Sequence, residues 1–180
     1  MHPINAEPDD ATERLAPATS TDAGADLAPG TQVGVYVLRG KLGEGGMGRV
    51  HLAEQLRPVQ RKVALKLIRE QVASPLARAY FDVERQALAQ MQHPAIARVY
   101  DAGTTDDGHP YLAMEVVEGA PLTRYCREHG LDRNARIVLF ERICHGVQHA
   151  HQKGIIHRDL KPSNVLVRED ASGWHPRLVD

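Results

Sequence analysis

Apolar and polar residues alternate in short runs through residues 33–118, and turn-forming residues separate the runs. Runs of this kind are typical of β-strands. The pattern predicts five strands, at residues 35–42, 49–54, 62–68, 97–102 and 111–116. Between the third and fourth strands, Ser74 and Pro75 signal a helix start, because serine caps a helix and proline suits its first position. This helix is expected to end near Met91.

The pattern becomes helical after Gly119. A short helix is predicted at residues 121–129, where Gly130 ends it, and a longer helix is predicted after Asp132. The longer helix should reach about residue 153, and its apolar stripe comprises Ile137, Ile143, Val147 and Ala150. Two short strands follow, at residues 165–167 and 177–179. This order indicates an α+β protein with a sheet lobe followed by a helical lobe.

Residues 1–30 differ from the rest of the chain in composition and charge. They are rich in Ala, Pro, Thr and Asp and lack apolar periodicity. One basic and six acidic residues give them a net charge of -5, so the remainder carries +4 of the total of -1. Such a segment buries too little apolar surface to offset its ordering entropy. We therefore expect a disordered tail at 1–32, a sheet lobe at 33–118 and a partial helical lobe at 119–180.

Charge and hydropathy argue against several classes of protein. The total charge of -1 provides no basic footprint for nucleic acid. No apolar run is long enough for a membrane span, and the N-terminus lacks the features of a secretory signal. Cys126 and Cys144 have no CxxC spacing, so two reduced thiols are expected. These features favour a cytoplasmic chain, although a membrane anchor further along a longer protein is compatible with them.

A glycine-rich motif of the form GxGxxGxV joins the first two predicted strands: Gly43, Glu44, Gly45, Gly46, Met47, Gly48, Arg49 and Val50. Glycines let the backbone approach phosphate oxygens and point N–H groups at them. Taken alone, the motif is equally compatible with a flexible hairpin turn. A dinucleotide-binding site is a further alternative, but there a helix begins at the loop. Because a strand is predicted after the last glycine, the sequence favours a hairpin flap over phosphates.

Lys66 and Glu84 are predicted to form an ion pair. Lys66 lies within the apolar third strand, where the simplest alternative is an edge lysine in solvent. Glu84 falls on the apolar stripe of the predicted helix, together with Ala77, Phe81, Leu88 and Met91. A carboxylate on a buried stripe needs a cationic partner, unless it lies at the edge of the stripe in water. The pair would hold the lysine ammonium where it can bind phosphates.

The most specific motif is HRDLxxxN, which residues 157–164 match as His157-Arg158-Asp159-Leu160-Lys161-Pro162-Ser163-Asn164. A chance match at its five fixed positions in a chain of this length has a probability on the order of 10⁻⁴. The motif follows a long predicted helix and precedes a short strand, which is the structural context that it requires.

With these motifs in this order, the chain resembles the bacterial eukaryotic-like (Hanks-type) Ser/Thr protein kinases, from about Val33 to Asp180. The resemblance implies a protein-kinase-like fold, with a five-stranded antiparallel N-terminal lobe that holds one helix and the beginning of a helical C-terminal lobe. It implies phosphorylation of Ser or Thr hydroxyls in a protein substrate, with ATP and Mg²⁺ as cofactors. No nucleic-acid partner is implied.

The resemblance also gives individual residues their roles. Asp159 would orient the substrate hydroxyl, and Lys161 would neutralise charge on the γ-phosphate. Lys66, held by Glu84, would bind the α- and β-phosphates. The magnesium ligands would be Asn164 and Asp180. The nucleotide would contact the glycine motif from Gly43 to Gly48 and seven further residues: Leu42, Val50, Ala64, Met114 (at the gatekeeper position), Glu115, Val117 and Leu166.

The chain ends at Asp180, where the resemblance implies that Phe-Gly would follow. We expect it to be a segment of a longer kinase, and we expect no measurable phosphate transfer from the isolated segment. Without further helices, the helix after Asp132 would expose its apolar stripe. Two alternatives remain: a nucleotide-binding module without transferase activity, and a small-molecule kinase. Small-molecule kinases of this fold usually carry HGD, so Arg158 and Lys161 argue against the second alternative.

Overall fold

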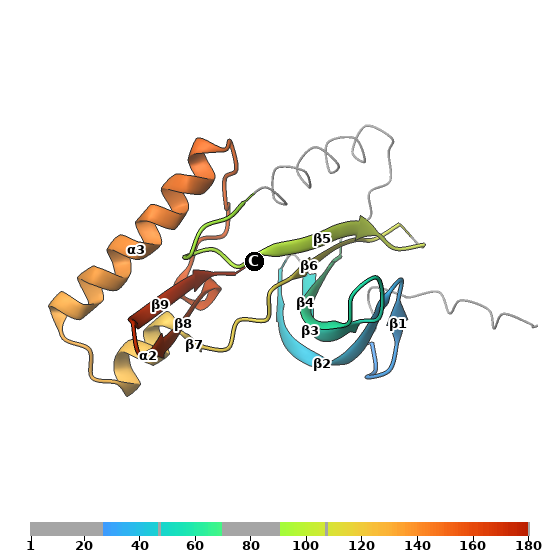
Figure 1. The fold of residues 1–180 in the computed structure, drawn as a ribbon, viewed down its shortest axis with the longest axis horizontal. Coiled ribbons are helices and arrows are strands. Elements are labelled where there is room, and N and C mark those ends of the chain that lie inside the picture. Colours follow the sequence, from blue (N-terminus) through green and yellow to red (C-terminus); the bar gives the residue numbers. More distant parts are fainter. Residues whose placement is uncertain (1–26, 47, 70–90, 107, 180) are drawn as a thin grey trace, which may run out of the picture.

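The computed structural model describes residues 27–46, 48–69, 91–106 and 108–179. Figure 1 shows two parts: a sheet formed by β1 to β6, and a second part formed by helices and a smaller sheet. The chain passes from one part to the other through residues 115–119, which connect β6 to β7. The last strand, β9, runs from the second part toward the first. The junction of the two parts is therefore formed by segments that are far apart in the sequence.

The larger sheet has six strands in the order β1-β2-β3-β4-β6-β5, and each neighbouring pair is antiparallel. The strands are β1 (Gln32–Val33), β2 (Tyr36–Gly45), β3 (Gly48–Gln55), β4 (Arg61–Ile68), β5 (Val99–Thr104) and β6 (Pro110–Met114). The five predicted strands correspond to β2 to β6, and the α+β class is confirmed. The predicted number of strands is one too low, because a strand of two residues carries no readable period.

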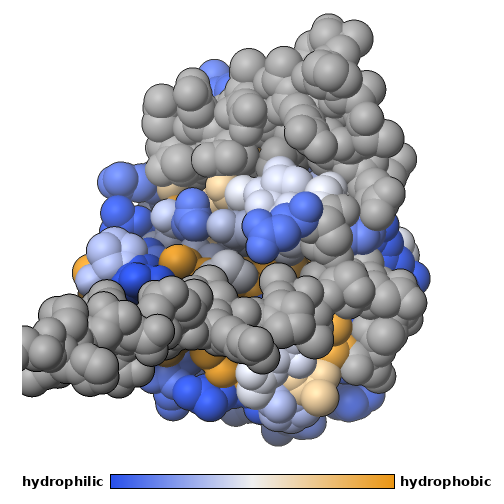
Figure 2. Space-filling model, turned by 90° about the vertical axis from the view of Figure 1, so that its right-hand side faces the viewer, coloured by the Kyte–Doolittle hydropathy of each residue, from blue (hydrophilic) through white to orange (hydrophobic). Residues whose placement is uncertain are grey.

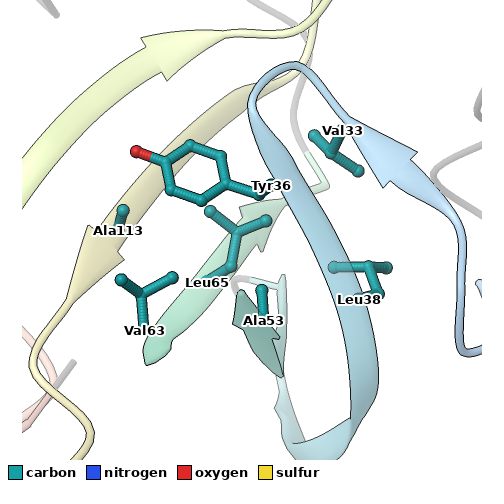
Figure 3. Packing of buried hydrophobic residues seen from close by; sticks show 7 residues of the cluster. All are labelled: Val33, Tyr36, Leu38, Ala53, Val63, Leu65 and Ala113. Atoms are coloured by element: carbon teal, nitrogen blue, oxygen red, sulfur yellow. The ribbon is translucent and has the colours of Figure 1, made fainter. Parts of the chain in front are cut away.

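One face of the larger sheet carries the hydrophobic core of the first part (Figure 3). Side chains alternate across a strand, so residues two positions apart share a face. In β4, Val63 and Leu65 face this core and are both 0% exposed. The core comprises Val33, Tyr36, Leu38, Ala53, Val63, Leu65 and Ala113. Ala64 and Lys66 therefore face the opposite side of the sheet.

Two helices dominate the second part: α2 (Leu122–Glu128) and α3 (Arg133–Gln152). Asp132 caps α3 as predicted, because its side chain accepts a hydrogen bond of 2.8 Å from the N–H of Ala135. Gly130 follows α2 with a φ of 58°, a conformation that glycine adopts without strain. Both predicted helices after Gly119 are thus present.

The smaller sheet has the order β7-β8-β9, with β7 (Ala120–Pro121), β8 (Val165–Asp170) and β9 (Gly173–Leu178). A single helical turn, η1 (Pro162–Asn164), leads into β8. Strands β8 and β9 are longer than predicted because polar residues continue both of them. In β8 the last three residues are exposed, so they lack the apolar signal from which a strand is predicted.

Strand β9 connects the two parts through its backbone. Leu178 forms a parallel bridge with Ile96. The N–H of Ala97 donates to the carbonyl of Leu178, and the N–H of Leu178 donates to the carbonyl of Ala95, both at 2.8 Å. Gly146 of α3 packs at the same place, since a Cβ there would lie 3.1 Å from the Cβ of Ala95. Helix, strand and residues 95–97 are therefore closely packed at the junction.

Two predicted elements lie largely outside the described residues: the acidic tail, up to residue 26, and the inserted helix at 74–91, up to residue 90. In the described ranges, no helix has the length and hydropathy needed to cross a membrane. Both cysteines are free thiols, with Cys126 buried and Cys144 exposed.

Figure 2 shows one side of the molecule, where hydrophobic surface forms small orange areas between blue hydrophilic side chains.

Candidate nucleotide-binding and phosphate-transfer site

Strand register brings four of the predicted site residues to one face of the larger sheet. Directly opposed residues of an antiparallel pair share a face. Val50 of β3 lies opposite Lys66 of β4, and Ala64 of β4 lies opposite Met114 of β6. Lys66 and Ala64 are two positions apart on one strand, so all four side chains face the same way. They lie on the side of the sheet that faces away from the core of Figure 3.

Lys66 is buried, with 6% of its surface exposed. Strand β4 lies between β3 and β6, so the alternative of an edge lysine in solvent is wrong. A buried ammonium group needs an opposite charge or a polar ligand. Its predicted partner, Glu84, lies outside the described residues, and this ion pair stays a prediction.

The glycine motif forms a hairpin in which the glycines have two different structural roles. Its strands pair as far as Gly45 opposite Gly48, so the turn is shorter than predicted. A Cβ added to Gly43, Gly45 or Gly46 would meet no atom within 4 Å. At Gly48 it would lie 2.1 Å from the carbonyl oxygen of Leu67. Gly48 is therefore required by the packing of β3 on β4, whereas the other three leave the backbone open to a ligand.

Glu44, between the first two glycines, is surrounded by basic side chains. Lys41 Nζ lies 2.6 Å from its carboxylate and Arg49 Nε lies at 3.3 Å, while Arg69 also pairs with it. The hydrogen bond from Lys41, together with Arg49, lowers the pKa of Glu44 to about 2. The carboxylate is engaged along the hairpin, so the backbone is the part of Glu44 that suits a phosphate.

The other residues predicted to contact the nucleotide base belong to three different segments. Leu42 falls at a register shift between β2 and β3 and is 53% exposed, so it offers apolar surface to a ligand. Leu166 of β8 and Val117 of the connecting segment are half-buried. The N–H of Glu115 donates to the carbonyl of Arg98 at 2.8 Å. The carbonyl is therefore the backbone group that Glu115 can offer to a nucleotide.

Asp159 is held by two side chains of its own loop. Lys161 Nζ donates to its Oδ2 at 2.7 Å, and Asn164 Nδ2 donates to the same oxygen at 3.1 Å. Asn164 Nδ2 also donates to the Asp159 carbonyl at 2.9 Å.

The residue before Asp159 has an unusual backbone conformation. Arg158 has a φ of 61°, a left-handed conformation that is unusual for a residue with a side chain. Unusual backbone conformations of this kind are concentrated at functional sites.

The electrostatics of the loop keep Asp159 ionised. The hydrogen bond from Lys161 lowers the pKa of Asp159, and the bond from Asn164 lowers it further. An ionised carboxylate only accepts hydrogen bonds, which suits it to bind a hydroxyl proton. The Asp159 side chain is 31% exposed, so a substrate can reach it.

Asn164 and the end of β9 fit the predicted magnesium site. Asn164 is buried, and its amide nitrogen is engaged by Asp159, which makes its amide oxygen the atom suited to a metal. The N–H of Val179 donates to the Asn164 carbonyl at 2.9 Å. This bond holds the residue that precedes Asp180 beside Asn164, although Asp180 itself lies outside the described residues. Amide and carboxylate oxygens are ligands that Mg²⁺ prefers.

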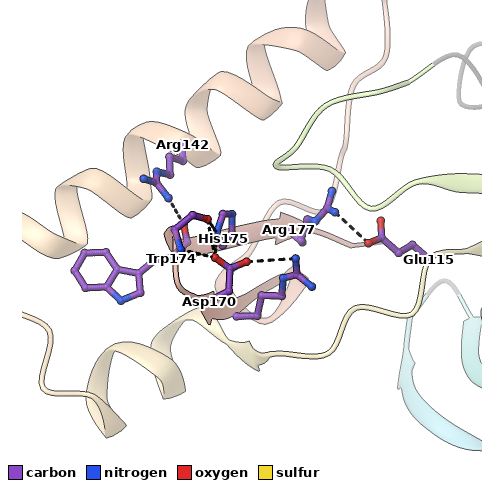
Figure 4. Close-up of polar contacts among 8 residues, drawn as sticks. Glu115, Arg142, Asp170, Trp174, His175 and Arg177 are labelled. Carbon is purple, nitrogen blue, oxygen red and sulfur yellow. Dashed lines mark hydrogen bonds and ion pairs between the residues drawn. The ribbon is translucent and has the colours of Figure 1, made fainter.

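The structure brings one further pair to this region that the sequence does not predict. Arg177 Nη2 lies 3.1 Å from Glu115 Oε1 (Figure 4). The two residues are 62 positions apart, and no motif contains both. The sequence indicates this pair only through the opposite charges of the two residues, and many other pairs of residues in the chain also have opposite charges.

Gly119 has a packing role that the sequence does not predict, since a Cβ there would lie 2.8 Å from the carbonyl oxygen of Val167.

An open glycine hairpin, a buried lysine on the next strand and a loop that presents an aspartate are recurring parts of the protein kinases. Residues 36–180 match the protein kinase domain family, and the chain belongs to this family.

Named relatives agree with this membership. The chain is 38% identical over 157 residues to serine/threonine-protein kinase pkn2 of Myxococcus xanthus. The aligned region covers 86% of this chain and 19% of pkn2. It is also 38% identical over 138 residues to serine/threonine-protein kinase PrkC of Bacillus subtilis, covering 74% of this chain and 21% of PrkC. The chain thus matches about a fifth of the length of these relatives.

Solved structures show the same fold. The crystal structure of the PknI kinase domain of Mycobacterium tuberculosis is similar, with a TM-score of 0.70 and 28% sequence identity. The match covers 86% of this chain and 62% of the PknI chain.

Proposed function

We propose that this chain provides the ATP site and the catalytic loop of a kinase that phosphorylates Ser and Thr hydroxyls of proteins. The observation that carries the proposal is the carboxylate of Asp159, fixed by Lys161 at 2.7 Å and by Asn164 at 3.1 Å. The relatives described above are named serine/threonine-protein kinases, which supports the choice of hydroxyl. The Lys161-Pro162 dipeptide supports it too, because it resembles Ser/Thr kinases rather than tyrosine kinases.

Phosphoryl transfer depends mainly on positioning and on neutralising charge. The Asp159 carboxylate accepts a hydrogen bond from the substrate hydroxyl and aligns it for in-line attack. Lys161 donates to the same carboxylate, so its positive charge lies beside the place where the transferred group gains negative charge. Lys66, on the nucleotide-facing side of β4, would bind the α- and β-phosphates.

A bound Mg²⁺ would supply positive charge that offsets the negative charge of the phosphates. Asn164 and Asp180 would hold it. The backbone of the hairpin at Gly43, Gly45 and Gly46 has room for phosphates. Ala64 and Met114, paired across β4 and β6, would contact the base.

The test is transfer of labelled phosphate from the γ-position of ATP by the protein that contains this chain. We expect label on Ser and Thr of an acceptor protein, and a loss of about 10²- to 10⁴-fold in rate for Asp159→Asn. Asp106→Asn, a matched change at an exposed aspartate, should leave the rate unchanged. Equal rates for Asp159→Asn and the parent would refute the proposal. Nucleotide binding without transfer would favour a binding module, and label on small molecules alone would favour a small-molecule kinase.

A further inference from the structure

Arg177 contacts two segments at the junction of the two parts. Its Nη2 donates to Glu115 Oε1 at 3.1 Å, and its Nη1 donates to the carbonyl of Ile96 at 3.0 Å. The side chains of Arg177 and Glu115 are 21% and 25% exposed, so water screens this pair less than it screens a surface pair. Figure 4 shows the arginine reaching from β9 to the start of the connecting segment.

Glu115 is itself fixed on both sides. Its Oε2 accepts from the N–H of Arg98 at 3.2 Å, and its own N–H donates to the Arg98 carbonyl at 2.8 Å. The carboxylate therefore uses one oxygen for Arg98, which directly precedes β5, and the other for Arg177. A guanidinium group matches this arrangement because its planar fork donates in two fixed directions, whereas a lysine ammonium does not.

The position of this contact relates it to both ends of the candidate site. Glu115 directly follows Met114, and its backbone lies at the end predicted to bind the base. Arg177 lies on β9, and Val179, which directly follows this strand, donates its N–H to the Asn164 carbonyl at 2.9 Å. One side-chain contact thus connects the base end of the site with the metal end.

We propose that Arg177 is a positioning residue that sets the metal end of the nucleotide site relative to the base end by holding Glu115 and Ile96. This inference rests on the proposed function and deepens it, since it names a residue that determines how tightly magnesium and nucleotide bind together. In this role, Arg177 contacts neither nucleotide nor metal. Its effect reaches the metal through the backbone of β9.

The test compares ATP binding with and without Mg²⁺, by titration of a fluorescent ATP analogue, in the parent chain and in Arg177→Gln. We expect Arg177→Gln to weaken binding of the magnesium complex by about fivefold or more. Binding without magnesium should weaken less, because the base end keeps its strand pairing. Arg168→Gln is a matched control, because Arg168 is exposed on the neighbouring strand and pairs with Asp170 at 3.6 Å. It should bind like the parent.

Glu115→Gln and the double variant complete the test and guard against a variant that does not fold. Glu115→Gln should reproduce the loss, and the double variant should lose no more than either single variant. Arg177→Lys should behave like Arg177→Gln, because it keeps the charge but lacks the fork. Equal losses with and without magnesium, or losses that add in the double variant, would overturn the inference. A parent chain that binds no nucleotide would instead overturn the proposed function, and the inference with it.

Discussion

Asp159 and Asp170 show, at the scale of single residues, that a lowered pKa alone does not identify a catalytic carboxylate. Hydrogen bonding to the Ser172 hydroxyl and backbone lowers the pKa of Asp170 to about 2. Asp170 is the exposed last residue of β8, beside the turn to β9, and it also contacts His175. The pKa of Asp159 is lowered by Lys161, a residue of the phosphate-transfer motif. The neighbours of each carboxylate, and not the shift itself, distinguish the two sites.

Removing the ammonium beside Asp159 is expected to raise the pKa of its carboxyl group. Lys161 lowers this pKa because its positive charge favours the ionised form. In Lys161→Ala, the Asp159 carboxyl should therefore titrate at higher pH than in the parent, as followed by carboxyl carbon chemical shifts. Lys153→Ala, at an exposed lysine after α3, should leave the titration unchanged. An unchanged titration in Lys161→Ala would contradict the contact.

The close packing of β3 against β4 depends on the absence of a side chain at Gly48. In Gly48→Ala, the new methyl group would collide with the Leu67 carbonyl, so β3 would have to move away from β4. We expect a loss of about 1–3 kcal/mol in the free energy of unfolding, measured by urea denaturation. Gly43→Ala meets open space and should change stability far less. Equal stabilities of the two variants would show that the hairpin does not pack as described.

Helix α3 depends on its N-terminal cap. Asp132 accepts a hydrogen bond from the N–H of Ala135 at 2.8 Å, which satisfies one of the free donors of the first turn. Asp132→Ala is expected to cost about 1 kcal/mol of stability, whereas Asp132→Asn should cost less because asparagine also caps helices. Circular dichroism during urea denaturation would measure both. A larger loss for asparagine than for alanine would contradict this role.

The elements that the sequence predicts well are those with a long period or a clear boundary residue. Helix α3 has both an apolar stripe and the Asp132 cap. Strand β5 is expected at 97–102 but runs from Val99 to Thr104. The shift arises because Ala97 pairs with Leu178 of β9 instead, and local sequence contains no information on such a distant partner. The site motifs are local and are therefore predictable, whereas the contact between Arg177 and Glu115 depends on tertiary structure.

At the scale of the whole molecule, the expectation that α3 exposes its predicted apolar stripe is wrong for three of the four residues: Ile143 and Ala150 are buried, and Val147 packs against the core that contains them. Strand β9 and residues 91–96 supply this cover, and α3 exposes other apolar surface. Ile137 is 53% exposed and Phe140 is 65% exposed. They line a groove between α2 and α3 together with Leu122, Cys126 and Leu131. Exposed apolar surface of this kind favours self-association.

Replacing Phe140 with a charged residue is therefore expected to improve the solution behaviour of the chain. Phe140→Asp removes exposed apolar surface without affecting buried Leu139, which is 0% exposed. Sedimentation velocity should show less self-association, with an unchanged melting temperature. Gln148→Asp adds the same charge at another exposed position of α3 and should not reduce association. Equal association of both variants would indicate that net charge, rather than the apolar surface, is responsible.

The two parts of the molecule carry different halves of the candidate site. The larger sheet presents Lys66 and the glycine hairpin, and the second part presents Asp159 and Asn164. Between them lie the backbone pairing of Leu178 with residues 95–97 and the contact of Arg177 with Glu115. We therefore expect nucleotide and magnesium to bind together only when both parts are in place.

The most direct test of this claim is magnesium-dependent ATP binding by the chain, with folding verified by circular dichroism. We expect ATP to bind more tightly with Mg²⁺ than without it, and we expect Lys66→Met to weaken this binding by about 10- to 100-fold, because a charged hydrogen bond to phosphate is removed. Lys62→Met, at an exposed position of the same strand, should bind like the parent. If the folded parent chain binds no ATP, or if Lys66→Met binds ATP as tightly as the parent does, this assignment of the nucleotide site is wrong.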